Sequence, residues 1–281
     1  MRFALRTLRN NPGFALTTII TLALGIGVTT AIFSVVNAVL LRPLPYADPE
    51  RLIILWSDMR ARNVLNFPLA PGDFPDIRAQ ATLLEDFAGL ATGRQTIIND
   101  NAAPEQVRAA FTTPNIFSVL GVKFSLGRGF VASDGTPNPQ PPQPPPGAAA
   151  PAQPTGPQAP RLPTIAVLSH GFWQRRFGSD SGVIGKTIQL GGGPATVVGV
   201  LAADAELLFP PSAGIDRVPD VWVALRIDFA SASRINVFLR TIGRLKTGVT
   251  IEQANAQLEK VAADLRERFP VKKGADLHFR V

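Results

Sequence analysis

The residues of this sequence that could perform chemistry are few, and they form no recognisable constellation. The 281-residue chain has two histidines, His170 and His278, and no cysteine. A protein metal site normally draws two or more His, Cys or carboxylate ligands from fixed spacings, and neither histidine has such neighbours in sequence. The lack of cysteine also excludes disulfides and cysteine-based metal or redox centres. We expect His170 to be a surface or helix-capping residue.

Two pairs of neighbouring carboxylates are the next candidates, Asp73 with Asp76 and Glu85 with Asp86. Carboxylates in pairs can divide general acid and general base roles between them. Each pair here is explained more simply by the capping or solvation of a short helix, since nothing marks either pair as an acid–base couple. The serine-nucleophile patterns Gly-x-Ser-x-Gly and Ser-x-x-Lys do not occur.

Gly185-Lys186-Thr187 resembles the end of a phosphate-binding loop. That loop needs a second glycine five residues earlier, so that bare backbone can wrap the phosphates, and this position is Asp180. A strand-like pattern also follows, where a helix should begin. We therefore predict no catalytic, cofactor-binding or metal-binding residue and no cofactor.

The element that must position everything else is a long apolar stretch. No charged residue occurs from Asn10 to Leu41, whereas about 20 apolar helical residues suffice to cross a hydrocarbon core of about 30 Å. We predict a transmembrane helix over about Thr17–Val39. A buried helix of a soluble protein and a cleaved signal peptide are the alternatives; the first seldom runs uncharged for so long, and the second has an apolar core of only about 7–15 residues.

Charge gives the orientation of this helix. Arg2, Arg6 and Arg9 precede it without any acidic residue, so the positive-inside rule places the N-terminus in the cytoplasm, near anionic lipid headgroups. The predicted organisation is a basic interfacial segment at 1–13, a transmembrane helix at 14–41 and an extracytoplasmic domain at 42–281. The protein would then be a single-pass protein of the inner (plasma) membrane, with the lipid bilayer as a partner.

Residues 42–281 predict an α+β domain, in one or two subdomains. Thr250–Gln253 fits a capping box, and apolar residues at spacings of three and four follow it until Pro270. The other predicted helices are Pro71–Gln80, Leu83–Leu90, Pro114–Leu120 with Gly121 as its C-terminal glycine, and a helix from the cap Ser169 to Phe177. The predicted strands are Arg51–Ser57, Thr96–Asn99, Gln106–Thr112, Thr164–Leu168, Thr187–Leu190, Ala195–Val200, Val221–Leu225, Asn236–Leu245 and Leu277–Val281.

One segment differs from the rest of the domain in composition. Residues 135–163 hold nearly half of the 26 prolines of the chain, which predicts a disordered or polyproline II insertion. The formal net charge of the whole chain is +7, but the basic residues are scattered and are not interleaved with aromatic ones. We therefore expect no nucleic-acid partner.

Several segments together resemble one known family. They are Val167–Gly178, Val183–Leu190, Thr196–Val200 and Asp220–Leu225, supported by Leu44–Leu52, Asn115–Val122, Leu126–Phe130 and Leu245–Ala254. The set resembles the MacB-like periplasmic core domain of MacB/FtsX-type ABC transporter permeases, and Met1–Gly13 with the apolar stretch is similar to the duplicated, macrolide-exporter-like group. The sequence departs from the pattern at Phe124, where a proline is common, and at Gly191–Gly193, where Asn-Gly is common.

The resemblance implies a subunit, or a fragment of a subunit, of an ABC permease that takes part in ATP-driven efflux or mechanotransmission without catalysis of its own. Its implied partners are permease transmembrane helices, from itself or a paired half, and a separate cytoplasmic ABC ATPase. The family has further transmembrane helices after this domain and the sequence stops at Val281, so a C-terminally truncated or split permease is expected. The alternatives are a membrane-anchored exported enzyme and a stand-alone adhesion or signalling ectodomain.

Overall fold

The computed structural model describes residues 12–36, 46–99, 102–139, 162–205, 215 and 218–281. The chain divides into two units, residues 1–44 and residues 45–281, and each is described by itself. The predicted basic segment lies almost entirely outside the described residues, and so does most of the proline-rich insertion, whose described ends are residues 135–139 and 162–163.

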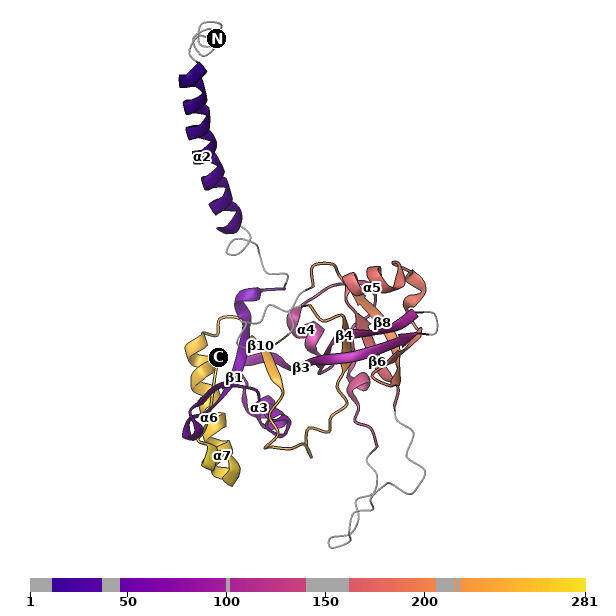
Figure 1. Ribbon diagram of the computed structural model, residues 1–281. Coiled ribbons are helices and arrows are strands. Elements are labelled where there is room, and N and C mark those ends of the chain that lie inside the picture. Colours follow the sequence, from indigo (N-terminus) through magenta and orange to yellow (C-terminus); the bar gives the residue numbers. More distant parts are fainter. Residues whose placement is uncertain (1–11, 37–45, 100–101, 140–161, 206–214, 216–217) are drawn as a thin grey trace. The chain divides into compact units, whose positions relative to one another are not determined.

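The first unit contains helix α2, Pro12–Val36 (Figure 1). Within the part of the chain that the structure describes, this is the one helix long and apolar enough to cross a membrane, judged by length and composition. Its threonines turn their hydroxyl groups inward: Thr21 and Thr29 donate to the carbonyl oxygens of Thr17 and Gly25, each at 2.8 Å. Such bonds remove the cost of placing a hydroxyl in hydrocarbon. The helix starts five residues before the predicted Thr17, with proline in its favoured first position, and the predicted end at Val39 lies outside the described residues.

In the described part of the second unit, one sheet of eleven strands has the order β11-β1-β10-β3-β4-β9-β6-β8-β5, with β2 beside β1 and β7 beside β3 and β8. The fold is mixed α/β, as predicted. The bounds are β1 Leu52–Met59, β2 Val64–Phe67, β3 Leu84–Asn99, β4 Ala102–Thr112, β5 Phe124–Gly127, β6 Thr164–Leu168, β7 Thr187–Leu190, β8 Gly193–Leu201, β9 Val221–Ala224, β10 Arg240–Leu245 and β11 Leu277–Arg280.

Strand β3 is the longest strand and changes partners along its length. Its residues 84–90 pair antiparallel with β10, and its residues 90–99 pair antiparallel with β4. The predicted short helix at Leu83–Leu90 is therefore wrong, because this segment is the first half of β3. Phe87, Ala88 and Leu90 are all buried, so both faces of the strand are covered, and the alternation that marks a half-exposed strand is missing.

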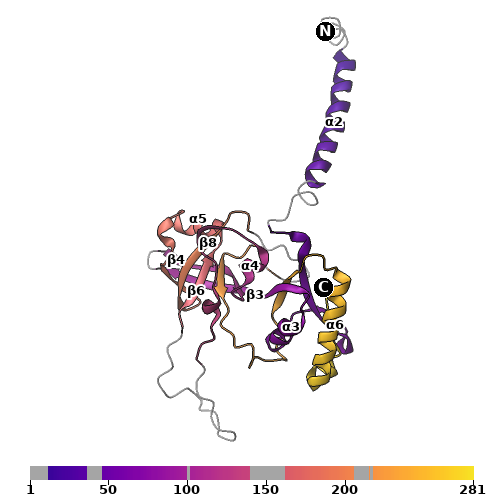
Figure 2. The same cartoon turned by 180° about the vertical axis from the view of Figure 1, so that it is seen from behind.

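Within the described residues, the second unit also contains five α-helices: α3 Phe74–Gln80, α4 Ile116–Leu120, α5 His170–Phe177, α6 Ile251–Arg268 and α7 Pro270–Ala275. Both ribbon views show α6 beside β1 at one end of the sheet and α5 near β8 at the other (Figures 1 and 2). Single turns of 3-10 helix complete the connections: η2 Pro49–Arg51, η3 Arg60–Arg62, η4 Pro71–Asp73, η5 Ala132–Gly135 and η6 Ser181–Val183.

The helix ends follow the local sequence signals closely. The Thr250 hydroxyl accepts from the Gln253 N–H at 3.3 Å, and the Gln253 side chain accepts from the Thr250 N–H at 3.0 Å, which confirms the capping box. Ser169 caps α5 as predicted, and Gly121 ends α4 in the left-handed conformation. Pro270 does more than end α6, since it is also the first residue of α7.

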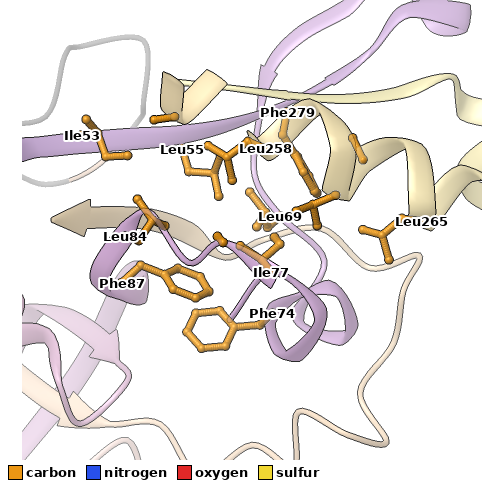
Figure 3. Packing of buried hydrophobic residues seen from close by; sticks show 14 of the residues in the cluster. Ile53, Leu55, Leu69, Phe74, Ile77, Leu84, Phe87, Leu258, Leu265 and Phe279 are labelled. Atoms are coloured by element: carbon orange, nitrogen blue, oxygen red, sulfur yellow. The ribbon is translucent and has the colours of Figure 1, made fainter. Parts of the chain in front are cut away.

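The buried side chains form three clusters. The first core cluster packs α3 and α6 onto β1, β10 and β11, and Phe74 and Phe87 face each other in it with ring centroids 4.2 Å apart (Figure 3). The second core cluster lies under α5, around Phe172, and the third packs α4 against the middle of the sheet, around Phe117. Strand β3 contributes to all three clusters, through Leu84 and Phe87, Ile97, and Ala88 and Leu90 respectively.

Three smaller differences from the sequence-based expectations concern strands. The structure adds β2 and β5, which were not predicted, and β10 begins at Arg240 rather than at Asn236. The segment just before β10 is held by its backbone instead, since Leu239 and Leu69 form an isolated antiparallel bridge.

A pair of glycine substitutions tests the close approach of β8 to the chain beside β5. A Cβ at Gly199 would overlap the carbonyl oxygen of Arg128, which is backbone and cannot rotate away, whereas a Cβ at Gly171 in α5 would meet nothing within 4 Å. We expect Gly199→Ala to lower the free energy of unfolding by about 1–3 kcal/mol, and Gly171→Ala to raise it by up to about 1 kcal/mol through helix propensity. Thermal unfolding of the full chain in detergent, followed by tryptophan fluorescence, measures both. Equal stability of the two variants would contradict this packing.

Candidate functional site

A cavity of about 550 Å³ in the second unit lies between the first and third core clusters. Five segments far apart in sequence form its walls, and these are α3, the β4–α4 connection, α4, the chain from 130 to 135, and the chain that leaves β9. The lining residues are Phe74, Pro75, Arg78, Thr113, Pro114, Asn115, Phe117, Ser118, Phe130, Ala132, Gly135, Leu225, Ile227 and Phe229.

Aromatic pairs form two walls of the cavity. Phe74 and Phe229 stack with ring centroids 4.7 Å apart and an interplanar angle of 25°. Phe117 and Phe130 form the second wall, with ring centroids 5.0 Å apart. Each pair is fixed from behind, Phe74 by Phe87 of β3 and Phe117 by Trp222 of β9, at 5.3 Å between centroids. The walls are therefore preformed by the packing of the core.

Three polar side chains of the cavity lining, those of Arg78, Thr113 and Asn115, form bonds within the protein. Thr113 accepts from the Gly89 N–H at 3.0 Å and donates to the Asn115 side-chain oxygen at 2.7 Å. The Asn115 amide donates to the Asp86 carboxylate at 2.7 Å and to the Phe87 carbonyl oxygen at 2.9 Å. Arg78 pairs with the same carboxylate at 3.1 Å. These bonds tie the polar rim to β3.

The structure places Asp73 and Asp76 in an ion network beside α3. Arg234 bonds to Asp73 at 3.1 Å and to Asp76 at 2.7 Å, Arg268 bonds to Asp76 at 2.6 Å, and Lys272 donates to Asp73. Asp73 and Lys272 are both buried. The network joins the start of α3 to α6, to α7 and to the chain before β10, so it fixes tertiary structure.

The two carboxyl groups of this network differ in their proton affinity. Burial raises the pKa of Asp73 above its ordinary value, although the charges of Lys272 and Arg234 and their hydrogen bonds oppose that shift. Burial also disfavours ionisation of Asp76, but the hydrogen bonds and charges of Arg268 and Arg234 outweigh it and lower the pKa of that carboxyl. The side chains of Arg234, Arg268 and Lys272 thus bind the oxygens of both carboxyl groups, as in a structural ion network.

The other carboxylates considered in the sequence also serve as ion-pair partners. Glu85 pairs with Arg51, and Asp86 pairs with Arg78.

Sequence reasoning missed Asp220, which is buried before β9 and accepts from the Arg108 backbone N–H at 2.9 Å as well as from the Arg108 side chain. Burial disfavours its ionisation, but these bonds together lower the pKa of Asp220.

The two histidines lie apart, in separate contacts. His278 on β11 is half-buried between Glu259 at 2.9 Å and Asp276 at 3.1 Å. His170, half-buried in the first turn of α5, lies with its ring centroid 5.4 Å from that of Trp173. Within the described ranges, no group of three or more His, Cys, Asp or Glu residues could hold a metal ion.

Gly185-Lys186-Thr187 is not placed to wrap a phosphate. Lys186 bonds to Asp180 at 2.7 Å, and β7 begins at Thr187, which confirms the strand expected there.

The cavity itself was not predicted, because its residues fall in five segments that share no spacing. The one signal for it was the density of phenylalanine, since the chain has 17 of them and one tyrosine.

Comparisons with known proteins agree with this fold. The family described as MacB-like periplasmic core domain matches residues 15–261. No curated protein sequence matches the chain significantly.

Three solved structures resemble the chain at low sequence identity. A domain assigned to a permease protein of Porphyromonas gingivalis gives a TM-score of 0.56 at 15% identity, covering 83% of this chain and 90% of that one. The extracellular domain of the noncanonic ABC-type transporter YknZ from Gram-positive bacteria gives a TM-score of 0.51 at 14% identity, covering 82% of this chain and 98% of that one. The periplasmic region of MacB from Actinobacillus actinomycetemcomitans gives a TM-score of 0.51 at 12% identity, covering 82% of this chain and 87% of that one. At these identities the likeness is one of fold.

The buried Asp73–Lys272 pair yields a stability prediction. Lys272→Met would leave the buried Asp73 with Arg234 as its remaining cation, so we expect a loss of about 3 kcal/mol in the free energy of unfolding, at the low end for a broken buried pair. Lys273→Met, one residue further along α7 and exposed, should change it by less than about 0.5 kcal/mol. Adding Asp73→Asn to Lys272→Met should recover part of the loss. Equal effects of the two lysine variants would show that the pair contributes nothing.

Proposed function

The chain belongs to the family of MacB-like periplasmic core domains, and from this premise we propose that it works as the membrane-anchored extracytoplasmic part of an ABC-type permease. The observation that carries the proposal is the span of the family match, which begins at residue 15 within α2 and ends at residue 261 within α6. One match thus covers both the apolar helix and the sheet-containing domain. We retain the predicted division into a basic segment at 1–13, a transmembrane helix at 14–41 and a periplasmic core domain at 42–281 with an insertion at 135–163.

The proposed partners are permease transmembrane helices and a separate cytoplasmic ABC ATPase. Support for the first comes from α2, where Thr21, Gly25 and Thr29 recur every four residues on one face and a Cβ added at Gly25 would meet nothing within 4 Å. Small residues at this spacing let a second helix approach closely. An ATPase acting across the membrane would change the domain by favouring one of two arrangements, as coupling between distant sites requires. The chain itself would supply no catalysis.

The absence of native cysteine makes the proposed orientation directly testable. Single cysteines are introduced as Thr7→Cys before α2 and as Ser181→Cys at an exposed position of the domain. In cells with a permeabilised outer envelope, a maleimide that cannot cross the inner membrane should label Ser181→Cys and leave Thr7→Cys unlabelled until the cells are lysed. The cysteine-free parent chain is the control. Labelling of Thr7→Cys before lysis would reverse the orientation.

The division of labour with an ATPase is tested in native membranes. We expect a tagged full-length chain to retain an ABC ATPase, recognised by mass spectrometry through its Walker A sequence, and to lose it when α2 is replaced by an unrelated membrane-spanning helix. The chain purified free of that partner should hydrolyse no ATP. ATP turnover by the isolated chain, or retention of the ATPase by the chain with the unrelated helix, would contradict the proposal.

A further inference from the structure

We propose that the aromatic cavity of about 550 Å³ is a binding site for an uncharged, apolar molecule that carries aromatic rings. This volume falls within the range of about 300–1,000 Å³ that is usual for small-molecule sites. The proposal concerns the cavity alone, and it stands whether or not the chain works with an ATPase.

The shape of the cavity favours flat rings. Phe229, stacked on Phe74, and Phe130, tilted against Phe117, are half-buried and present aromatic surface to the cavity. Aromatic rings gain from offset-stacked and edge-to-face contacts at centroid separations of about 4.5–7 Å. A ligand ring in the cavity could make such contacts with Phe229 or Phe130.

The walls are already in place, so binding would not have to order them. Phe74 rests on Phe87, and Phe117 rests on Trp222, and the three residues Phe74, Phe87 and Trp222 are at most 3% exposed. Pro75 and Pro114 stiffen the rim. A site formed before its ligand arrives avoids much of the entropy cost of binding.

The polar chemistry of the lining selects against charged ligands. Thr113 and Asn115 already use their side chains in bonds to each other and to β3, and Pro75 and Pro114 have no backbone N–H to offer. The charge of Arg78 is balanced by Asp86 at 3.1 Å. A charged ligand would lose its hydration here without equivalent compensation, whereas an apolar ligand would gain by leaving water.

Binding of such a ligand would also affect the stability of the domain. Phe74 and Phe229 pack with the first core cluster, and Phe117 and Phe130 pack with the third. A bound molecule would add contacts between the two clusters, and a ligand that binds only the folded arrangement stabilises it by mass action.

Benzophenone is a suitable probe, because it is an uncharged molecule of two rings that forms covalent adducts under near-ultraviolet light. The full chain in lipid nanodiscs is irradiated with it, and the labelled peptides are identified by mass spectrometry. We expect adducts in the second unit to concentrate in the segments 74–78, 113–118, 130–135 and 225–229, and excess diphenylmethane to compete for them. Labelling of α2 by probe dissolved in the lipid serves as an internal reference.

Cavity-filling variants supply the matched comparison. Ser118→Phe fills the cavity from an exposed rim position of α4, and Ser181→Phe places the same side chain at an exposed position outside it. Ser118→Phe should reduce labelling of the cavity segments about tenfold, equivalent to about 1.4 kcal/mol, while Ser181→Phe leaves it unchanged. Ala132→Phe fills the cavity from a different wall and should act like Ser118→Phe, and melting curves by tryptophan fluorescence verify that all three variants fold.

Three results would overturn the proposal. The first is equal labelling of the cavity segments in Ser118→Phe and in Ser181→Phe, with both variants folded. The second is labelling spread evenly over exposed peptides. The third is labelling by 4-benzoylbenzoate, the carboxylate analogue, as strong as that by benzophenone, since the proposed site should disfavour that anion about tenfold or more.

Discussion

The structure depends on β3, because this one strand must satisfy two sets of neighbours. Its first half pairs with β10 and its second half with β4, and its side chains enter all three core clusters. Gly89 shows how tight the junction is, since a Cβ there would lie 2.7 Å from the Leu239 side chain. The two halves of the sheet are therefore joined through one continuous, closely packed strand.

The cavity is a consequence of the same strand. Phe87 supports Phe74 on one wall, the Gly89 N–H holds Thr113 on another, and Asp86 binds both Arg78 and Asn115. Three residues of β3, Asp86, Phe87 and Gly89, thus fix side chains from α3 and from the β4–α4 connection. These contacts hold the side chains of the cavity walls in place.

Local signals in the sequence predicted the elements that are stabilised locally. Thr250 with Gln253, Ser169 and Gly121 act through bonds to residues three or four positions away, so a single sequence is enough to recognise them. Leu84–Leu90 could not be recognised in this way, because burial on both faces comes from chain segments distant in sequence. The cavity could not be recognised from the sequence for the same reason, because its aromatic pairs join residue 74 with residue 229 and residue 117 with residue 130.

The ion network gives α3 a second anchor, independent of the sheet. Asp73 and Asp76 hold the start of α3 to Arg234, Arg268 and Lys272, while Phe74 between them lines the cavity. A buried pair of charges contributes little net stability but penalises every arrangement in which one partner is lost. Such a network therefore favours one position of α3 over alternative positions in which a buried charge would lose its partner. A change that moves the start of α3 would break the buried Asp73–Lys272 pair and would reshape the Phe74–Phe229 wall. The shape of the cavity is therefore linked to the packing of α7 against α3.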